Sequence, residues 1–275
     1  MASPTLYKYH GLGNDFLITR ALDEPDAMRR LAQRLCPRHT ALGADGVLFW
    51  DIHPDGRPRM TIYNRDGSRP EMCGNGLRCL ALFLVQHGHV ERSEASVRLQ
   101  VHTDAGLKGC LVAAVEGAQA QVTIEMGIPS EISGDAALDD EGRFGTWFGV
   151  DMGNPHAVVM GMEPLDVIDT LGRALNAPPQ HPSFPHGVNG EFVHAAGPHV
   201  YDVVVFERGV GRTQACGTGA CAVAWALWRQ GVEAPEQPVT VRLPGGELVL
   251  TLTPDGGVTM KGPAAWVYQA QLPKG

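Results

Sequence analysis

The sequence has few of the features that would support binding to nucleic acid or a membrane. Its 22 Lys and Arg residues are outnumbered by 30 Asp and Glu, and the resulting charge of -8 argues against a phosphate-backbone partner. No stretch approaches the roughly 18 uninterrupted apolar residues of a membrane span, and Met1 to Gly13 lacks the apolar run of a signal peptide. We therefore expect a cytoplasmic protein with no nucleic-acid or membrane partner.

Cysteine is also scarce, with six residues in a chain of 275. That number is too low for a secreted disulfide framework, so reduced thiols are expected. Hydrophobic residues make up 44% and charged residues 19%, which is typical of a globular enzyme. Free thiols are then available for chemistry at Cys36, Cys73, Cys79, Cys110, Cys216 and Cys221.

The chain contains an internal duplication. Shifting the sequence by 143 positions lays YNRDGSRPEMCGNG over FERGVGRTQACGTG, so that Cys73 falls on Cys216 and Arg65 falls on Arg208. A glycine that can end a helix, Gly88, falls on Gly231 in the same register. A period of about half the chain, present twice, indicates a duplicated domain rather than a solenoid.

Each repeat predicts short strands followed by one apolar helix. Runs such as GVLFW and YDVVVF are typical of strands, whereas LRCLALFLVQHG and ACAVAWALWRQG are long enough for three helical turns and apolar all round. We predict an α+β fold of two pseudo-symmetric halves, each a curved, mostly antiparallel sheet wrapped around a central buried helix. The expected halves are residues 1–118 with the tail 263–275, and residues 119–262.

Each of the two matched cysteines begins a Cys-Gly-x-Gly loop at the start of an apolar helix. Free amides and the positive end of the helix dipole lie there, and they favour a carboxylate ligand and a lowered thiol pKa. If the two helix starts converge on one cleft, one thiolate can remove an α-proton while the opposite thiol delivers another. The pattern therefore predicts an amino-acid racemase that uses Cys73 and Cys216 as base and acid.

Other interpretations of these cysteines explain the pattern less well. A buried, inert cysteine before a helix is common, but two in register are not explained by packing alone. Zinc sites favour C-x-x-C pairs, whereas Cys73 and Cys79, like Cys216 and Cys221, diverge around a helix. We expect no metal and no cofactor, since the four lysines (Lys8, Lys108, Lys261 and Lys274) have no motif around them for pyridoxal phosphate.

The motifs HGLGNDF, GADG, YNRDGS, MCGNGLRC, GNPH, FERG and ACGTGACA together make the chain resemble diaminopimelate epimerases over nearly its whole length. The resemblance implies the fold predicted above and interconversion of LL- and meso-diaminopimelate on the route to lysine and peptidoglycan. It further implies independence of pyridoxal phosphate, an amino-acid substrate and a homodimer.

The resemblance also implies a set of substrate-binding residues. It assigns the reacting carboxylate to the loop amides, the cleft lining to Asn14, and the second amino-acid head of the substrate to five polar side chains. The loop residues are Gly74, Asn75, Gly217 and Thr218, and the polar set is Asn64, Asn154, Asn189, Glu207 and Arg208. His156 is expected to orient a neighbour.

Several of these residues also have ordinary structural explanations. Asn14, Asn64 and Asn154 lie in turns where asparagine is common, and adjacent Glu207 and Arg208 can form a surface ion pair. The sequence departs from the family pattern at Arg212, where glutamate is usual. It departs also at Gly187 and Gly190, around Asn189, and at Gly46.

Two alternatives to this function stay open. The first is a related two-thiol racemase of proline or hydroxyproline, although such sequences carry His where Asn75 stands. The second is a non-catalytic amino-acid-binding protein of the same fold. A phenazine-biosynthesis-type isomerase is disfavoured because it lacks both cysteines.

Overall fold

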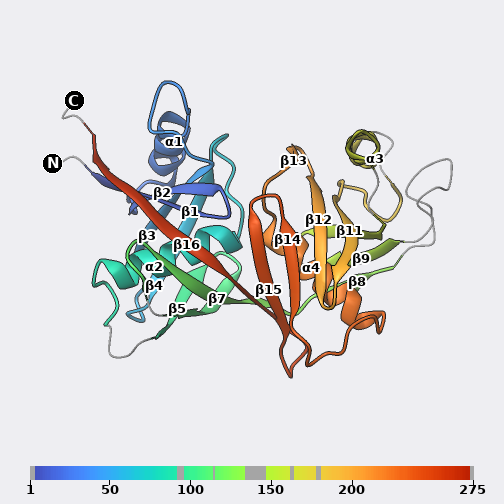
Figure 1. Ribbon diagram of the computed structural model, residues 1–275. Coiled ribbons are helices and arrows are strands. Elements are labelled where there is room, and N and C mark those ends of the chain that lie inside the picture. The colour runs from blue at the N-terminus through green and yellow to red at the C-terminus, as the bar shows by residue number, and fades with distance from the viewer. Residues whose placement is uncertain are drawn as a thin grey trace. The chain divides into compact units, whose positions relative to one another are not determined.

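The computed structural model describes residues 4–91, 96–113, 115–133, 147–161, 164–177 and 181–272 (Figure 1). Its contacts divide the chain into two compact units, Met1–Ile124 with Lys261–Gly275, and Glu125–Met260. We had expected borders after residues 118 and 262. The observed borders fall inside two strands, β7 (Gln119–Gly127) and β16 (Val258–Gln271), because each strand runs on from one unit into the other.

The first unit is a ring of strands around one helix. The strand order β1-β2-β3-β4-β5-β6-β7-β16 is closed by pairing of β16 with β1. Most neighbours are antiparallel, but β2–β3 and β4–β5 are parallel, because a helix connects each of these pairs. The remaining strands are β1 (Thr5–Gly11), β2 (Asn14–Arg20), β3 (Gly46–Ile52), β4 (Pro58–Asn64), β5 (Val97–Thr103) and β6 (Gly106–Val112).

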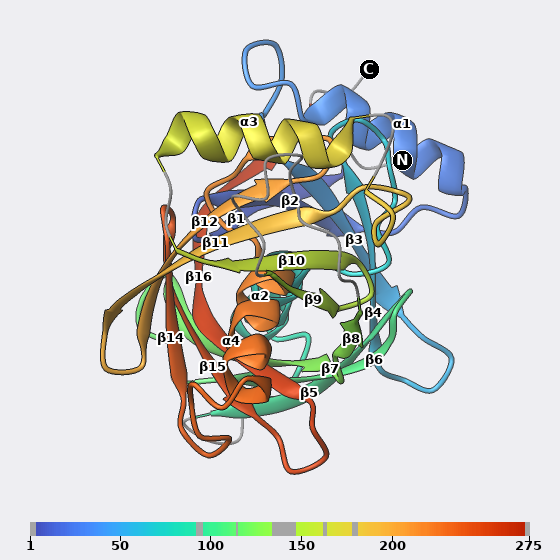
Figure 2. The same cartoon turned by 90° about the vertical axis from the view of Figure 1, so that its right-hand side faces the viewer.

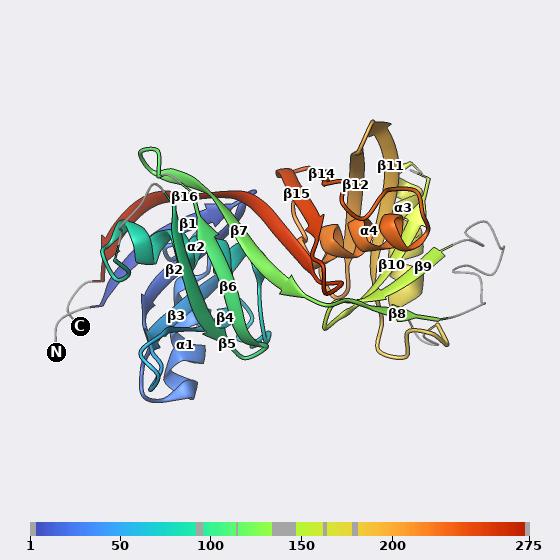
Figure 3. The ribbon, with the colours of Figure 1, turned by 90° about the horizontal axis from the view of Figure 1, so that it is seen from below.

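Two helices cover opposite faces of these strands, α2 (Gly74–Gln86) inside and α1 (Pro25–Leu35) outside (Figure 3). Every residue of α2 from Gly74 to Val85 is buried, as its mostly apolar sequence requires. The strands between the helices are buried on both faces, which explains why β3 reads as the continuous apolar run GVLFW. In β5 the burial alternates, since one of its faces is exposed.

The second unit repeats the same element order. Its strands β8 to β12, β14 and β15 surround α4 (Gly217–Arg229), and α3 (Leu165–Asn176) covers the outer face of β10–β12 (Figure 2). The strands are β8 (Ser130–Ile132), β9 (Trp147–Asp151), β10 (Pro155–Met160), β11 (Asn189–Gly197), β12 (Val200–Glu207), β13 (Gly211–Arg212), β14 (Val239–Leu243) and β15 (Gly246–Leu252). The predicted fold class, including the two-fold repetition and the central helices, is confirmed.

The two central helices match in length as well as position in the repeat. Each has 13 residues, and their first residues lie 143 positions apart, the offset seen in the sequence. Each is followed by a glycine with positive φ, Gly88 at 69° and Gly231 at 70°. These glycines occupy the left-handed conformation that ends many helices. Among the described residues, no helix combines the length and apolarity needed to cross a membrane.

Candidate active site

Cys73 is the N-cap residue of α2. Its backbone is extended, with φ -138° and ψ 117°, and its Sγ accepts a hydrogen bond from the amide of Gly76 at 3.4 Å. The sulfur therefore takes the place of the hydroxyl or carboxylate oxygen that usually caps a helix. The loop is tight at residue 76, where a Cβ would lie 3.0 Å from a methyl group of Leu48.

Cys216 caps α4 in the same way. Its φ and ψ are -122° and 109°, and its Sγ accepts from the amide of Gly219 at 3.3 Å. The Thr218 hydroxyl lies 3.5 Å from the same sulfur. The duplicated sequence has thus produced two cysteines in one local geometry, each at the positive end of a buried helix.

The two sulfurs differ in burial and charge environment. Cys73 is partly exposed, whereas Cys216 is 7% exposed. Burial raises the pKa of the Cys216 thiol well above its usual value, and the nearby carboxyl groups of Glu207 and Glu191 raise it further. The expectation that the helix start would lower this pKa is therefore wrong for Cys216, because desolvation outweighs the hydrogen bonds from Thr218 and Gly219.

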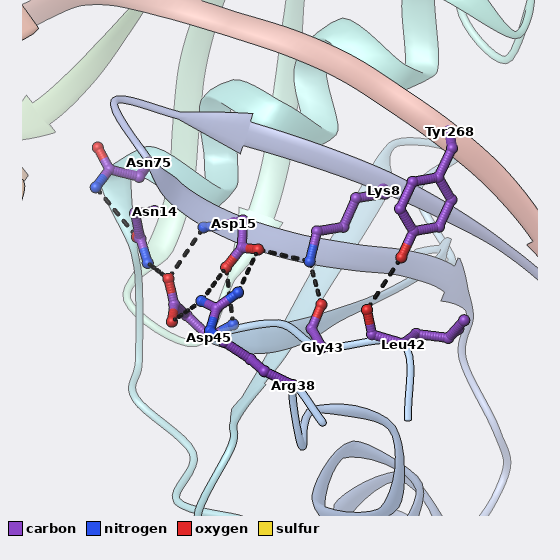
Figure 4. Close-up of polar contacts among 9 residues, drawn as sticks. All are labelled: Lys8, Asn14, Asp15, Arg38, Leu42, Gly43, Asp45, Asn75 and Tyr268. Atoms are coloured by element: carbon purple, nitrogen blue, oxygen red, sulfur yellow. Dashed lines mark hydrogen bonds and ion pairs between the residues drawn. The ribbon is translucent and has the colours of Figure 1, made fainter. Parts of the chain in front are cut away.

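Asn14 links the loop of Cys73 to the β-sheet (Figure 4). Its Oδ1 accepts from Asn75 Nδ2 at 3.1 Å and lies 4.0 Å from Cys73 Sγ, while its Nδ2 donates to Asp45 Oδ2 at 2.9 Å. The structure thus brings Asn14 to Cys73 and Asn75, two other residues expected at the site, from 59 and 61 positions away in the sequence. Asn75 is buried, with an exposed fraction of 3%.

An ion-pair network lies behind Asn14 (Figure 4). Asp15 accepts from both terminal nitrogens of Arg38, at 2.8 and 3.0 Å, and pairs with Lys8 at 2.6 Å. Burial acts to raise the pKa of Asp15, but the hydrogen bonds from Arg38 and Lys8 outweigh it and hold that pKa well below its usual range. Arg38 also donates to Asp45 at 2.8 Å, so the two carboxylates share one guanidinium.

Arg78 is a fully buried charge in the first turns of α2. Its Nη2 donates to Asn75 Oδ1 at 2.7 Å, and its Nε donates to the carbonyl of Pro263 at 3.3 Å. Gly11 allows this placement, because a Cβ there would lie 3.1 Å from the guanidinium. The Asn75 side chain is consequently held between Arg78 on one side and Asn14 on the other.

In the second unit, His156 lies between two oxygen atoms. Its Nδ1 is 2.6 Å from Glu191 Oε1 and its Nε2 is 3.1 Å from Asn154 Oδ1. His156 and Glu191 are both fully buried, and burial raises the pKa of Glu191 against the opposing effect of His156. Glu191 also lies beside the Cys216 loop, since a Cβ added at Gly219 would be 2.7 Å from Glu191 Oε1 and 3.3 Å from the sulfur.

The other expected residues of this unit form a second group. Asn189 Oδ1 accepts from the amide of Arg208 at 2.9 Å, and Arg208 donates to the His186 carbonyl at 2.8 Å while remaining exposed. Glu207 accepts from the Thr213 hydroxyl at 2.5 Å. Glu207 and Arg208 thus each have a hydrogen-bond partner of their own, Thr213 for Glu207 and His186 for Arg208.

The remaining predicted residue and two of the family departures also have defined partners. Asn64 donates to the Ser68 hydroxyl at 2.9 Å within the turn after β4. Arg212 donates to Asp169 on α3 at 2.7 Å. Gly187 has φ 81°, and a Cβ there would lie 2.3 Å from Asn176 Oδ1, so this chain needs glycine at that position.

The other two departures occur where backbones or side chains approach closely. A Cβ at Gly46 would lie 2.8 Å from the Tyr63 carbonyl on the paired strand β4. One at Gly190 would lie 3.3 Å from the Phe192 ring. Gly46 is therefore required by strand packing, whereas the contact at Gly190 is only moderately tight.

One group within the described ranges has the residue types of a metal site. His53, Asp55 and His102 place their ligand atoms within 4.8 Å of one another at the β3–β4 hairpin and β5. Asp55 already accepts from Arg57 at 2.7 Å and from His102 at 2.8 Å. The group is a partly exposed network of ion pairs and includes no residue of either cysteine loop.

Sequence reasoning missed three charged residues near the two cysteine loops, Asp45, Arg78 and Glu191. Asp45 lies in the GADG motif and Arg78 follows the Cys73 loop, but neither stretch of sequence indicates which residues these side chains contact. For Glu191 a signal was present, since a carboxylate among the apolar residues of a predicted strand must find a partner. The histidine that provides it, 35 positions away, is visible only in the fold.

Comparison with known proteins gives one family. A family model described as "Diaminopimelate epimerase" matches residues 6–132 and 148–267. Curated diaminopimelate epimerases from Desulfitobacterium hafniense, Moorella thermoacetica and Desulforudis audaxviator are 38%, 39% and 41% identical to the chain. These matches cover 97%, 97% and 96% of this chain and 97%, 98% and 97% of the relatives.

Solved structures share the fold at lower identity. A phenazine biosynthesis protein of the PhzF family from Bacillus anthracis has a TM-score of 0.77 at 16% identity, with 100% of both chains covered. A hydroxyproline epimerase from Agrobacterium vitis has a TM-score of 0.71 at 19% identity, covering 99% of this chain and 91% of its own. These likenesses concern the fold alone.

Proposed function

This chain belongs to the diaminopimelate epimerase family, and from that premise we propose that it interconverts LL- and meso-2,6-diaminopimelate. The observation that carries the proposal is the repeated cysteine geometry. In each unit a cysteine caps the central helix, and its sulfur accepts from the amide three residues later, at 3.4 Å for Cys73 and 3.3 Å for Cys216. A two-base isomerase needs two matched acid–base groups, and two thiols in one local geometry can supply them.

In the proposed reaction one cysteine acts as base and the other as acid. A thiolate removes the α-proton and leaves a carbanion, and the second thiol then gives a proton to the opposite face of the carbon. The first cysteine ends as the thiol and the second as the thiolate, so atoms and charge balance. Cys216 is the better candidate for the resting acid, because burial and the carboxyl groups of Glu207 and Glu191 disfavour its thiolate.

The carbanion must be stabilised for this reaction to proceed. We propose that the amides of Gly74, Asn75, Gly217 and Thr218 bind the reacting carboxylate, because unpaired amides at a helix start favour an anion. The distal end of diaminopimelate has an ammonium group and a carboxylate. Its ligands in this proposal are Asn64, Asn154, Asn189, Glu207 and Arg208, with Arg208 supplying donors and Glu207 an acceptor.

The proposed chemistry runs without pyridoxal phosphate. The buried lysine of the first unit, Lys8, pairs with Asp15 at 2.6 Å and donates to the Gly43 carbonyl. An ammonium held in this way is a poor candidate for a Schiff base, which requires a neutral amine. The two thiols and the loop amides therefore supply the chemistry in this proposal.

We further propose that the protein works in the cytoplasm as a homodimer, in the synthesis of lysine and of peptidoglycan precursors. Two apolar residues of β16 support a self-association surface, since Trp266 is 38% and Val267 is 54% exposed. The net charge of -8 supports a small amino-acid substrate over a nucleic-acid or anionic-membrane partner. Sedimentation of the purified protein would test the dimer, and a monomer at micromolar concentration would contradict it.

The activity is tested by incubating the protein with LL-diaminopimelate in heavy water. We expect formation of the meso isomer together with one deuterium at the inverted carbon, without added pyridoxal phosphate. Proline and hydroxyproline serve as competing substrates for the racemase alternative. Inversion of either in place of diaminopimelate would overturn the proposed substrate, and binding of diaminopimelate without α-proton exchange would support a non-catalytic binding protein.

A further inference from the structure

The orientation of the Asn14 amide is fixed by its neighbours. An asparagine side chain can turn over and exchange its oxygen and nitrogen with little change of shape. Here Asp45 Oδ2, an acceptor only, lies 2.9 Å from Asn14 Nδ2 and also accepts the amide of Asp15 at 3.1 Å (Figure 4). A flipped Asn14 would place two oxygen atoms against each other, so its Oδ1 must face Asn75 and Cys73.

The Asn75 amide is fixed from the other direction. Arg78 has donors only, and its Nη2 lies 2.7 Å from Asn75 Oδ1. Asn75 Nδ2 must then face Asn14 Oδ1, at 3.1 Å. The two amides form a directed chain between a carboxylate and a guanidinium, and each amide excludes the reversed orientation of the other.

We propose that Asp45 is a positioning residue for Cys73, acting through Asn14. By holding the Asn14 nitrogen, Asp45 turns Asn14 Oδ1 toward Cys73 Sγ, where that oxygen accepts a hydrogen bond from the thiol. The contact is 4.0 Å long in this structure. Contacts of this kind commonly shorten when a substrate binds.

Asp45 is itself held firmly. Arg38 donates to its Oδ1 at 2.8 Å, and Arg38 is fixed by two further bonds to Asp15, which pairs with Lys8 (Figure 4). The charged groups in this hydrogen-bond series are thus Lys8, Asp15, Arg38 and Asp45 on the sheet side and Arg78 on α2. An oxygen that accepts a hydrogen bond from S–H stabilises the thiol over the thiolate. In this proposal it therefore raises the pH at which Cys73 becomes nucleophilic.

The catalytic meaning of this inference rests on the proposed function, but its main test needs no turnover. The experiment measures the alkylation rate of Cys73 by iodoacetamide against pH, in a Cys216→Ala background. Cys36, Cys79, Cys110 and Cys221 are buried, so Cys73 is the expected site of reaction, which peptide mass spectrometry verifies. Asp45→Asn should lower the midpoint of the rate profile by about one pH unit, because Asn14 loses its fixed acceptor.

Two comparisons separate orientation from the loss of a charge. Asp51→Asn is the matched control, since Asp51 lies near the other end of β3 and accepts from the exposed Arg59 at 2.9 Å. This control should keep the original profile. Asn14→Ala should lower the midpoint as Asp45→Asn does, and adding Asp45→Asn to Asn14→Ala should produce no further shift, since the two residues act through one contact.

An unchanged profile in Asp45→Asn would overturn the inference. So would a full additional shift in the double variant, because Asp45 would then act through its charge alone. If Asp45→Asn does not fold, Asp45→Ala removes the same acceptor and gives the same test. A shifted profile in a protein that does not epimerise diaminopimelate would leave the positioning role standing and contradict the proposed function instead.

Discussion

Glu191 Oε1 lies 2.6 Å from His156 Nδ1, and both side chains are fully buried. The contact to Glu191 requires a proton between Nδ1 and Oε1, because two lone pairs would repel each other at this distance, and Nε2 lies 3.1 Å from Asn154 Oδ1. The second carboxyl oxygen, Oε2, is buried without a hydrogen-bond partner in the described part of the chain. This buried hydrogen bond lies next to the loop that carries Cys216.

Removal of this carboxyl group should destabilise the fold. Glu191→Ala leaves His156 buried with an unsatisfied ring nitrogen, and we expect a loss of about 3 kcal/mol in the free energy of unfolding. Urea denaturation measures it. Glu131→Ala is the control, because Glu131 pairs with Arg229 at 3.6 Å on the surface and should cost less than about 1 kcal/mol. Equal losses in the two variants would contradict the structural role of the buried pair.

The duplicated glycines of the two loops should differ in their tolerance of a methyl group. At Gly219 a Cβ would meet the hydrogen-bonded Glu191 at 2.7 Å, whereas at Gly76 it would meet a methyl of Leu48 at 3.0 Å. Since the Leu48 side chain can shift and the buried Glu191 cannot do so easily, Gly219→Ala should lower kcat by on the order of a hundredfold. The decrease in kcat for Gly76→Ala should be several-fold smaller than the decrease for Gly219→Ala.

The measurement is the initial rate of epimerisation of both variants at saturating substrate, with circular dichroism to verify folding. Similar rates in the two variants would show that Glu191 does not restrict the Cys216 loop as these distances indicate.

The pKa of Asp15 predicts how stability depends on pH. Despite burial, which acts to raise it, hydrogen bonds from Arg38 and Lys8 hold this pKa below its usual range. The unfolded state then binds more protons than the folded state in acid, so the contribution of Asp15 is present above about pH 4 and is lost as pH falls further. The stability gap between the natural protein and Asp15→Asn should narrow below about pH 4.

Thermal unfolding of both proteins between neutral pH and pH 3 checks this. Asp23→Asn, which changes an exposed carboxylate in the loop before α1, serves as the control and should show little difference at any pH. If the difference in stability between the natural protein and Asp15→Asn stayed constant down to pH 3, the pKa of Asp15 would not lie below its usual range.

Much of the fold could be predicted from the sequence because the duplication keeps its register. The 143-residue offset of Cys73 and Cys216 reappears as the offset of α2 and α4, and the apolar composition of both helices required their burial. The observed borders of the two units differ from the expected ones because they fall inside the strands β7 and β16. The alternation of residues in a strand does not show where along it one unit ends and the other begins.

The sequence was less informative about electrostatics. A helix start after Cys216 indicated a lowered pKa, but the depth of burial and the two nearby glutamates, which decide the direction, depend on tertiary packing. The same holds for Asn14, whose turn-like surroundings in GLGND gave no sign of its contact with Asp45, 31 positions later. Local motifs predicted which sulfur atoms react, whereas long-range contacts raise the pKa of Cys216.

The central claim is that Cys73 and Cys216 serve opposite faces of one carbon, and single-cysteine variants test it most directly. Cys73→Ala and Cys216→Ala are each incubated in heavy water with LL-diaminopimelate or with the meso isomer, and deuterium incorporation and inversion are measured. We predict that neither variant inverts the carbon, and that each exchanges the α-hydrogen of one isomer only, the two variants having opposite preferences. Inversion by either variant at a rate near that of the natural protein would contradict the two-thiol account.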